Sequence, residues 1–556
     1  MNRLFDTHHF RQSRQAAPVW NMTPLCADRP AQPVKVCVPG TWESIPGMGN
    51  YRGKCLYEQK FDGCGNMRFY FEGVSFRARV LVDGKELATH YGAYTGFDAI
   101  APELESGTHL LQVEADNSWG DDSALHIPND YYSYGGITRP VLIENIGDAY
   151  LTALHITTEK TAEGWLAHVE VTAQSLLDTD ANYAITLKID GITANKIPQP
   201  LPLYLPARQQ VTLRHTIHCC DVTPWTPSAP HLYPVKAHLS NGSAVIDDLI
   251  ERFGFREIRL QGQHILLNGE KLMLKGFNRH EDWGAFGCSI PLAAMVQDLK
   301  LMQDMGCNCV RTCHYPNDPL FLDLCDEMGM LVWEESHARG LNEKHMLHPR
   351  FMEQNLLCTR EMVAQHYNHP SIFIWGCLNE CADDTEYGAD CYRKTYQLLH
   401  ELDQSRPMTA ALLERKGGKV YGDSDVVSIN LYPLWYYEGN VKQQLDQKLA
   451  EIDATGGSGK PFIVSEIGAG AIFGNHDPLN ESKWSEERQC TILKAQIEAV
   501  LSHPRCSGIF LWQFADCRVC EETFYGRPRT YNNKGVVNEY RQPKLAYKTV
   551  KDLFRK

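Results

Sequence analysis

The first 258 residues form short runs in which apolar and polar positions alternate, and these runs end at Gly, Asn, Asp or Pro. Alternation of this kind is typical of strands that bury one face in an antiparallel sandwich. In one run, the segment VDGKE (82–86) places Asp-Gly where a two-residue hairpin loop needs positive φ. The alternation breaks and restarts near residue 149, so the pattern predicts two consecutive β-sandwiches.

Beyond residue 258 the chain changes to continuous apolar runs, separated by amphipathic stretches such as residues 291–305 and 350–367. Eight buried strands with helical crossovers are the repeat of a (β/α)8 barrel. An open doubly wound sheet is the alternative, but no glycine-rich phosphate loop follows the first strand, so the barrel is favoured. The predicted strands are residues 272–278, 307–312, 331–335, 372–378, 408–413, 426–432, 462–466 and 508–514.

The formal net charge of -14 argues against a nucleic-acid partner and against an anionic membrane surface, because both favour basic patches. No apolar run is long enough to predict a membrane span. Residues 1–20 lack the apolar stretch of a signal peptide, so we expect a cytosolic protein. We also expect the chain to form a homo-oligomer.

Three of the 19 cysteines, Cys307, Cys309 and Cys313, lie close together and raise the question of a zinc site. The spacing places the first two on opposite or crowded sides of one strand, which suits metal ligation poorly. Buried reduced thiols are the favoured interpretation. The sequence therefore predicts no metal site and no cofactor.

Polar residues follow the ends of the predicted barrel strands, where such barrels carry their active sites. Glu380 follows the fourth strand and Glu466 follows the seventh, so both are expected at one opening. A single strand-end glutamate is more often an ion-pair partner or a helix cap. Two of them in dense polar segments favour glycoside hydrolysis, in which one carboxylate attacks the anomeric carbon and the other protonates the leaving oxygen.

Four barrel segments resemble glycoside hydrolase family 2, which contains β-galactosidases, β-mannosidases and β-glucuronidases. They are NGEKLMLKGFNRHED (268–282), RTCHYPNDPLFLDLCDEMGMLVWEES (311–336), IFIWGCLNE (372–380) and FIVSEIG (462–468). Two earlier segments, residues 71–97 and 130–144, look like the sugar-binding-type sandwich of that family. The resemblance implies a jelly-roll β-sandwich over residues 1–148, an immunoglobulin-like β-sandwich over 149–258 and a catalytic (β/α)8 barrel over 259–556.

The same resemblance implies a retaining hydrolase with Glu380 as general acid/base and Glu466 as nucleophile. Asn379 is placed to hydrogen-bond the sugar 2-hydroxyl, an interaction that strengthens in the transition state. Tyr432 is predicted to orient the nucleophile, with simple packing as the alternative. Trp512 is predicted to offer the sugar ring a flat apolar face, with a core position as the alternative. The remaining predicted contacts at these strand ends are His280 and His314.

Residues 532–535, Asn-Asn-Lys-Gly, follow the last predicted strand and can be a tight surface turn or an anion site. β-Glucuronidases are similar here, with an Asn, one intervening residue, a Lys and a Gly that bind the substrate's carboxylate. In this chain the pattern assigns Asn532 and Lys534 to a uronate carboxylate. Charge-assisted hydrogen bonds from such groups would favour a uronide over a neutral hexoside, so the uronate is the favoured interpretation.

The stereochemistry at C4 of the sugar stays open. Asp130 resembles an Asp that reaches the distal hydroxyls in both gluco- and galacto-specific members. His337 and Arg339, in the segment EESHARG, depart from ordinary β-glucuronidases and add donors near C3 and C4, where they could admit an axial hydroxyl. Equally, Arg339 could only pair with an acid at the rim.

Two other functions are weighed against a β-hexuronidase. A β-galactosidase acting on neutral sugars would have no use for Lys534. A non-catalytic carbohydrate-binding protein on the same scaffold would need neither Glu380 nor Glu466. The sequence therefore predicts an enzyme that hydrolyses terminal β-glucuronides or β-galacturonides, with a small-molecule or oligosaccharide uronide as its substrate.

Overall fold

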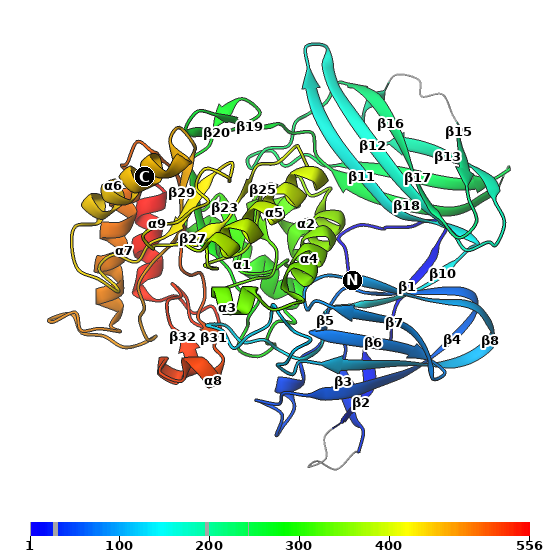
Figure 1. Cartoon of the computed structure of the whole chain (residues 1–556), viewed down its shortest axis with the longest axis horizontal. Coiled ribbons are helices and arrows are strands. Elements are labelled where there is room, and N and C mark those ends of the chain that lie inside the picture. Colours follow the sequence, from blue (N-terminus) through cyan, green and yellow to red (C-terminus); the bar gives the residue numbers. More distant parts are fainter. Residues whose placement is uncertain (1, 26–31, 195–199, 243) are drawn as a thin grey trace.

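Figure 1 shows the computed structural model, in which two β-sandwiches lie beside a barrel of strands and helices. The structure describes residues 2–25, 32–194, 200–242 and 244–556. The predicted architecture of sandwich, sandwich and barrel is confirmed.

The first sandwich is organised around two long strands, β4 and β8, which pair along most of their length. Alternate side chains of β4 are buried, among them Phe61, Phe69 and Phe71, as the period of two in the sequence requires. The main sheet has the order β1-β10-β4-β8-β6-β7, with β2 and β3 added at β4. β5 and β9 pair in a separate two-stranded sheet. The elements of this sandwich are β1 (Gln12–Gln15), β2 (Val19–Pro24), β3 (Val34–Cys37), η1 (Trp42–Ser44), β4 (Lys54–Phe71), β5 (Val74–Ser75), β6 (Arg77–Val82), β7 (Lys85–Tyr91), β8 (Phe97–Asp116), β9 (Gly136–Ile137) and β10 (Val141–Ile146).

The second sandwich consists of two four-stranded sheets with the orders β11-β12-β16-β14 and β15-β13-β17-β18. Their facing side chains form one apolar core that includes Trp165, Leu187 and Phe253. The strands are β11 (Ala149–Thr161), β12 (Gly164–Ser175), β13 (Ala181–Ile189), β14 (Thr193–Ala194), β15 (Leu201–Leu205), β16 (Gln210–Cys220), β17 (Tyr233–Asn241) and β18 (Ala244–Phe253).

The barrel strands run parallel, and β22 pairs with both β23 and β30. The first and last strands are therefore neighbours, which excludes the open doubly wound sheet. The predicted fifth strand is split at Ala410 into β26 and β27. The strand order begins with β26 and ends with β27, so the barrel is near-closed. The strands are β22 (Leu274–Asn278), β23 (Cys309–Thr312), β24 (Leu331–Glu335), β25 (Ile372–Gly376), β26 (Met408–Thr409), β27 (Ala411–Leu413), β28 (Val427–Asn430), β29 (Phe462–Ile467) and β30 (Cys506–Leu511).

Helices follow most barrel strands and cover their outer face (Figure 1). The last loop contains a two-stranded ribbon, β31 (Cys517–Arg518) with β32 (Tyr531–Asn532), and two short helical turns, α8 (Glu521–Phe524) and η3 (Pro528–Thr530). The other helical elements are α1 (Leu292–Asp304), α2 (Pro319–Met328), α3 (Glu343–Met346), α4 (Phe351–His366), α5 (Glu386–Leu402), α6 (Val441–Ile452), η2 (Asp453–Gly457), α7 (Glu486–Leu501) and α9 (Leu545–Phe554).

The amino-terminal end of the barrel is closed by a small sheet of β19 (Ile258–Gln261), β20 (His264–Leu267) and β21 (Glu270–Lys271). Trp225, from the second sandwich, is fully buried in the same apolar cluster as Leu274 of β22. Its indole N–H donates to the backbone oxygen of Asp326 at 2.9 Å. The second sandwich therefore stabilises the end of the barrel that carries no catalytic groups.

The first sandwich contacts the opposite, carboxyl-terminal end of the barrel. Arg139 donates to the Glu281 carboxylate at 2.9 Å and to the backbone oxygen of Pro316 at 2.7 Å, and all of these atoms are buried. A buried ion pair of this kind costs several kcal/mol if one partner is removed, because the other charge is left unpaired. The contact holds the segment that carries Asp130 over the mouth of the barrel.

Among the described residues, no helix has both the length and the apolar character required to cross a bilayer.

Candidate active site

A pocket of about 240 Å³ lies at the carboxyl ends of the barrel strands. This is just below the range for ligand pockets, about 300–1,000 Å³, so it suits one sugar ring better than a longer chain. Seven of the residues predicted from the sequence line it, namely Asp130, Arg339, Glu380, Tyr432, Glu466, Trp512 and Lys534.

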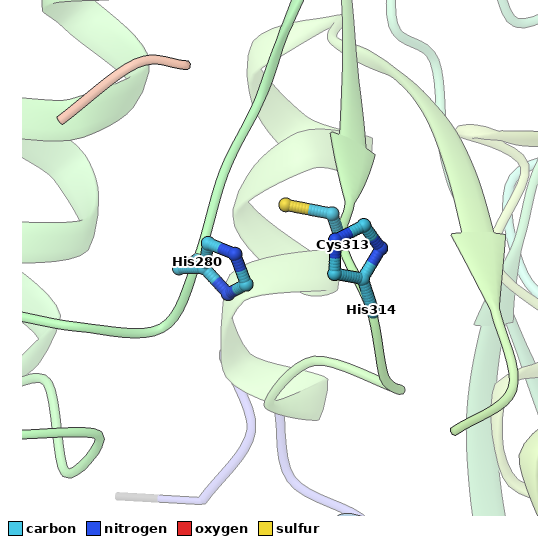
Figure 2. Close-up of side chains that lie close together, drawn as sticks. All are labelled: His280, Cys313 and His314. Atoms are coloured by element: carbon cyan, nitrogen blue, oxygen red, sulfur yellow. The ribbon is translucent and has the colours of Figure 1, made fainter. Parts of the chain in front are cut away.

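His280 and His314 do not line this pocket but contact Trp512, which does, and Figure 2 shows them beside Cys313. The His314 ring stacks on the indole with centroids 5.2 Å apart, and the His280 ring meets it edge-on at 5.4 Å. Burial, followed by nearby arginine charges, lowers the pKa of His280 to about 3 and that of His314 well below its ordinary value. Both rings are therefore neutral, and neither Nε2 atom has a hydrogen-bond partner within the described part of the chain.

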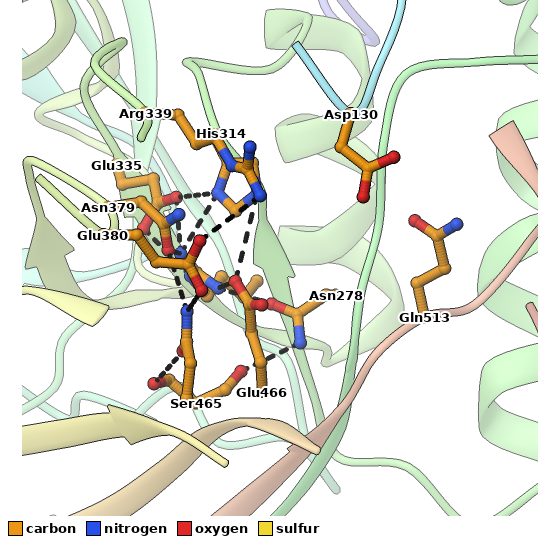
Figure 3. A network of polar contacts seen from close by, with 12 residues as sticks. Asp130, Asn278, His314, Glu335, Arg339, Asn379, Glu380, Ser465, Glu466 and Gln513 are labelled. Atoms are coloured by element: carbon orange, nitrogen blue, oxygen red, sulfur yellow. Dashed lines mark hydrogen bonds and ion pairs between the residues drawn. The ribbon is translucent and has the colours of Figure 1, made fainter. Parts of the chain in front are cut away.

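Arg311, on β23, bonds four of the residues labelled in Figure 3, namely Asn278, Glu335, Asn379 and Glu466. Its fully buried guanidinium donates to both oxygens of Glu335, at 2.7 and 2.9 Å. It also donates to Oε1 of Glu466 at 3.0 Å, and to the side-chain oxygens of Asn278 and Asn379 at 2.7 Å each. A planar group with several donors can fix residues from several strands in one geometry, which a lysine cannot do.

The Glu466 carboxylate, at the end of β29, is held by donors on both oxygens. Arg311 bonds Oε1, and the Tyr432 hydroxyl donates to Oε2 at 2.7 Å. Burial, and next the charge of Glu380, raise the pKa of Glu466 to about 7 against the opposing effect of Arg311. The carboxylate form, which a nucleophile requires, is therefore gained as the pH rises through neutrality.

Glu380 stands on a turn of unusual backbone geometry after β25. Leu378 and Glu380 have φ angles of 47° and 51°, a region that residues other than glycine seldom adopt. The Glu380 N–H donates to the backbone oxygen of Ala411 at 2.9 Å, which holds the turn in place. The carboxylate accepts from Asn430 at 3.0 Å and from Arg339 at 3.3 Å. Backbone strain of this kind gathers at functional sites.

Asn379, beside the predicted acid, has a satisfied oxygen and a free amide. The oxygen accepts from Arg311, while among the residues that the structure describes its Nδ2 has no hydrogen-bond partner. Because a buried donor without a partner is costly, this amide is available for a ligand hydroxyl.

Lys534 forms a cationic corner in the pocket wall. The side chain is only 2% exposed, and Nζ bonds the Tyr436 hydroxyl at 2.9 Å. The rings of Tyr432, Trp435 and Tyr436 lie 5.2 to 5.9 Å from the ammonium. Across the described ranges, no carboxylate is within ion-pair distance of it. A buried cation held only by aromatic rings and a hydroxyl is suited to an anionic ligand.

The loop around Lys534 has a rigid support. A Cβ at Gly535 would lie 2.3 Å from the backbone nitrogen of Asp516, so no larger residue fits. The Gly535 N–H donates to the Asp516 carboxylate, which pairs with Lys544 at 2.8 Å. Asn533 bonds the carbonyls of residues 528 and 531 at 2.8 Å each, so its role is to fold the loop.

Asn532 is fully buried and is not among the residues that line the pocket. Its amide donates to Asp130 at 3.1 Å, and its oxygen accepts the backbone N–H of Lys534 at 3.3 Å. Asp130 is also held by Arg527, whose Nε donates to Oδ1 at 3.1 Å. Asn532 therefore links the residue that the first sandwich contributes to the loop that carries the lysine.

His337, like His280, His314, Asn379 and Asn532, is a predicted site residue that does not line this pocket. Its ring lies 4.4 Å from that of His126 and 5.1 Å from that of Tyr94, both of the first sandwich. Its Nδ1 atom is 3.3 Å from the backbone oxygen of His314. The adjacent Arg339 does line the pocket, and it pairs with Glu380, an acid inside the site rather than at the rim.

Three residues of the site, two of which line the pocket, have no predicted role in the sequence. Arg311 is visible there only as a polar strand end, although it contacts Glu466 directly. Arg527 lies five residues before Asn532, outside the motif, and Tyr436 lies in a loop after β28. The clustering of arginines in RPR, residues 527–529, is the signal that could have indicated a second cation near Lys534.

Two carboxylates and a cationic corner in one pocket at the strand ends of a barrel are the arrangement of a glycoside hydrolase. Two family models match the chain: glycosyl hydrolases family 2, TIM barrel domain, over residues 258–556, and glycosyl hydrolases family 2, over residues 149–256. The chain belongs to glycosyl hydrolase family 2.

Among solved structures, the chain is similar to a family 2 β-galacturonidase from Eisenbergiella tayi bound to galacturonate. The two are 47% identical, the TM-score is 0.97, and the match covers 100% of this chain and 99% of the other. A putative β-glucuronidase from Formosa agariphila is 27% identical over 93% of this chain, which spans 66% of that protein's length. A β-galactosidase from Thermoanaerobacterium thermosulfurigenes is 30% identical over 89% of this chain and 66% of its own.

Tyr432→Phe is expected to move the acid limb of the pH profile of kcat/KM to higher pH. The hydroxyl stabilises the charged form of Glu466, and a hydrogen bond to a charged group contributes about 1.5–3 kcal/mol. Since about 1.4 kcal/mol corresponds to one pH unit, a displacement of about one unit or more is expected.

The matched control is Tyr437→Phe, because that hydroxyl bonds Glu414 and not Glu466. An unchanged acid limb in Tyr432→Phe would show that this hydroxyl does not tune the nucleophile.

Proposed function

We propose that this chain is a retaining exo-β-hexuronidase and that β-galacturonides are its preferred substrates. The observation that carries the uronide assignment is the buried ammonium of Lys534, which has no carboxylate partner within the described residues. The similarity to a β-galacturonidase at 47% identity supports the same substrate class.

In the proposed mechanism Glu466 attacks the anomeric carbon and Glu380 transfers its proton to the leaving oxygen. The assignment follows from the donors: Arg311 and Tyr432 both stabilise a carboxylate at Glu466. Water then hydrolyses the glycosyl–enzyme intermediate, with Glu380 accepting the proton of the water. The free amide of Asn379 is assigned to the sugar 2-hydroxyl.

The C6 carboxylate of the sugar is assigned to Lys534. Tyr436 bonds Lys534, and although burial of its hydroxyl acts the other way, the charges of Lys534 and Arg527 lower the pKa of Tyr436. The hydroxyl therefore lies in a cationic field in which a carboxylate would be stabilised more strongly than a neutral group. A neutral hexoside would leave this field without an anion, which argues for a uronide over a galactoside.

The preference at C4 is assigned to Arg339 and Asp130. Both line the pocket, and Nε of Arg339 is buried with no hydrogen-bond partner among the described side chains and backbone. A guanidinium whose other nitrogens contact Glu380 and Asn129 can use this donor for an axial hydroxyl. The alternative is that glucuronides are the better substrates. A panel of chromogenic glucuronide, galacturonide and galactoside distinguishes the two possibilities.

Trp512 is proposed as the apolar face for the sugar ring, since it lines the pocket and is supported from behind by His314. His280 and His314, through their free Nε2 atoms, are proposed to complete the contacts. The compartment and the oligomeric state remain as predicted from the sequence, a cytosolic homo-oligomer.

Glu466→Gln is expected to abolish turnover, because an amide cannot form the glycosyl ester. Glu380→Gln is expected to lower kcat/KM by about 10²–10⁴ for substrates with poor leaving groups, which need the acid, and far less for activated aryl glycosides. Product analysis by NMR at early times should show retention of the β-configuration. An inverted product would exclude the double displacement.

Lys534→Met is expected to lower kcat/KM for uronides by tens- to hundreds-fold, from a loss of about 1.5–3 kcal/mol or more. Activity on the matching hexosides, measured with a chromogenic panel of glucuronide, galacturonide and galactoside, should stay low and nearly unchanged. Lys416→Met, outside this pocket, is the matched control. If the ratio of uronide to hexoside activity is unchanged in Lys534→Met, the substrate assignment is wrong.

Arg339→Ala is expected to lower kcat/KM more for galacturonide than for glucuronide, because the axial hydroxyl loses its donor. A discrimination of about 1–3 kcal/mol, roughly five- to a hundredfold, is the expected size for one unpaired polar group. If Arg339 acts only through Glu380, the loss will instead follow the leaving group and be equal for both sugars. Arg415→Ala is the control, since that side chain bonds Asp384 and the backbone oxygen of Glu380 but not the Glu380 carboxylate.

A further inference from the structure

We propose that His280, Cys313 and His314 form a binding site for a thiophilic divalent cation such as Zn²⁺, and that the bound ion inhibits the hydrolase. One ligand atom from each residue lies within 4.8 Å of the other two, and all three side chains are buried (Figure 2). Two imidazoles and one thiol are the ligand set that zinc prefers, and one that Mg²⁺ and Ca²⁺ do not.

The two imidazoles are already prepared for a ligand on their Nε2 atoms. His314 Nδ1 lies 2.9 Å from the Glu335 carboxylate, which can only accept, and 3.2 Å from Nη2 of Arg311, which can only donate; in the tautomer that donates to the nearer carboxylate, Nε2 keeps its lone pair. His280 Nδ1 lies 3.2 Å from the Tyr315 hydroxyl, which can accept the ring proton in the same way. Carboxylate and hydroxyl partners of this kind orient histidines in metal sites.

Neither Nε2 atom has a hydrogen-bond partner within the described ranges of the chain. Unpaired buried nitrogens are uncommon in folded proteins. A bound sugar can satisfy them, as proposed above, and so can a cation. The two occupants therefore compete for the same atoms.

The geometry requires only small shifts. In tetrahedral zinc sites with bonds of about 2.0–2.3 Å, neighbouring ligand atoms are about 3.3–3.8 Å apart, so side-chain movements of about 1 Å complete the triad. Glu466 offers a fourth ligand, since its Oε1 lies 3.9 Å from Nε2 of His314. The thiolate and the carboxylates of Glu335 and Glu466 offset the nearby charge of Arg311.

The structure also separates Cys313 from the other cysteines of its segment. Cys309 packs in the apolar cluster at the closed end of the barrel, whereas Cys313 packs with Tyr432 and Trp512 at the pocket. The zinc motif that the sequence raised and rejected joined Cys313 to Cys307 and Cys309. The histidines of the proposed site are His314, which is the next residue in the chain, and His280, which follows β22.

A cation here would inhibit for two reasons. It would hold both histidines away from the sugar, and it would neutralise Glu466, whose charge the attack requires. Inhibition should therefore be relieved by chelators and by saturating substrate.

The test uses the purified full chain and two readouts, of which only one depends on catalysis. Co²⁺ added to the reduced protein should give a near-ultraviolet charge-transfer band that requires thiolate ligation. Zn²⁺ should inhibit hydrolysis of whichever glycoside the enzyme turns over best, and EDTA should restore it. Cys313→Ser should remove the band and raise the inhibitory Zn²⁺ concentration at least tenfold.

Cys64→Ser, which replaces an exposed cysteine, is the matched control and should change neither readout. Cys313→Ala provides a second variant if the serine variant does not fold. Equal Zn²⁺ sensitivity in the wild type and the Cys313 variants, or a Co²⁺ band that survives in them, would overturn the proposal. So would wild-type protein that shows no band.

Discussion

The site depends on one buried charge, the guanidinium of Arg311. Removing a charge from water costs several kcal/mol, and the cost is offset only where partners surround it with good geometry. Here Glu335 accepts two of its hydrogen bonds and Glu466 a third. Because these carboxylates belong to β24 and β29, the arginine on β23 fixes these two strands relative to one another.

A second constraint is the distribution of charge. The chain is acidic as a whole, yet the pocket wall contains Lys534, Arg527 and Arg339. Two of these cations are bound to carboxylates of the site itself, Asp130 and Glu380, and the third is bound to a hydroxyl. Asp130 and Glu380 therefore neutralise Arg527 and Arg339. Lys534 is the cation of these three that is left to bind an anionic ligand.

Much of this could be predicted from the sequence, because periodicity reports directly on buried faces. All eight barrel strands and the two sandwiches before them are confirmed, and the one irregular strand, split at Ala410, keeps its apolar pattern on both sides of the break. Strand-end position also placed Glu380, Glu466 and Tyr432 in one pocket, since strands of a barrel end at a common face.

What the sequence could not indicate depends on side-chain direction. His337 and Arg339 are two residues apart, and only the second lines the pocket, because the first packs against the first sandwich. Asn532 and Lys534 share one motif, yet the asparagine amide bonds Asp130, some 400 residues earlier in the chain. Contacts between distant segments of this kind leave no local pattern.

The bonds from Arg527 and Asn532 to Asp130 also have a consequence for biosynthesis. Domains fold in order as the chain leaves the ribosome, so the first sandwich forms long before the barrel is complete. The pocket, however, needs residue 130 and residue 534 together. A nascent or prematurely terminated chain can thus present a folded sandwich and most of a barrel without the lysine at residue 534 or the loop that bonds Asp130.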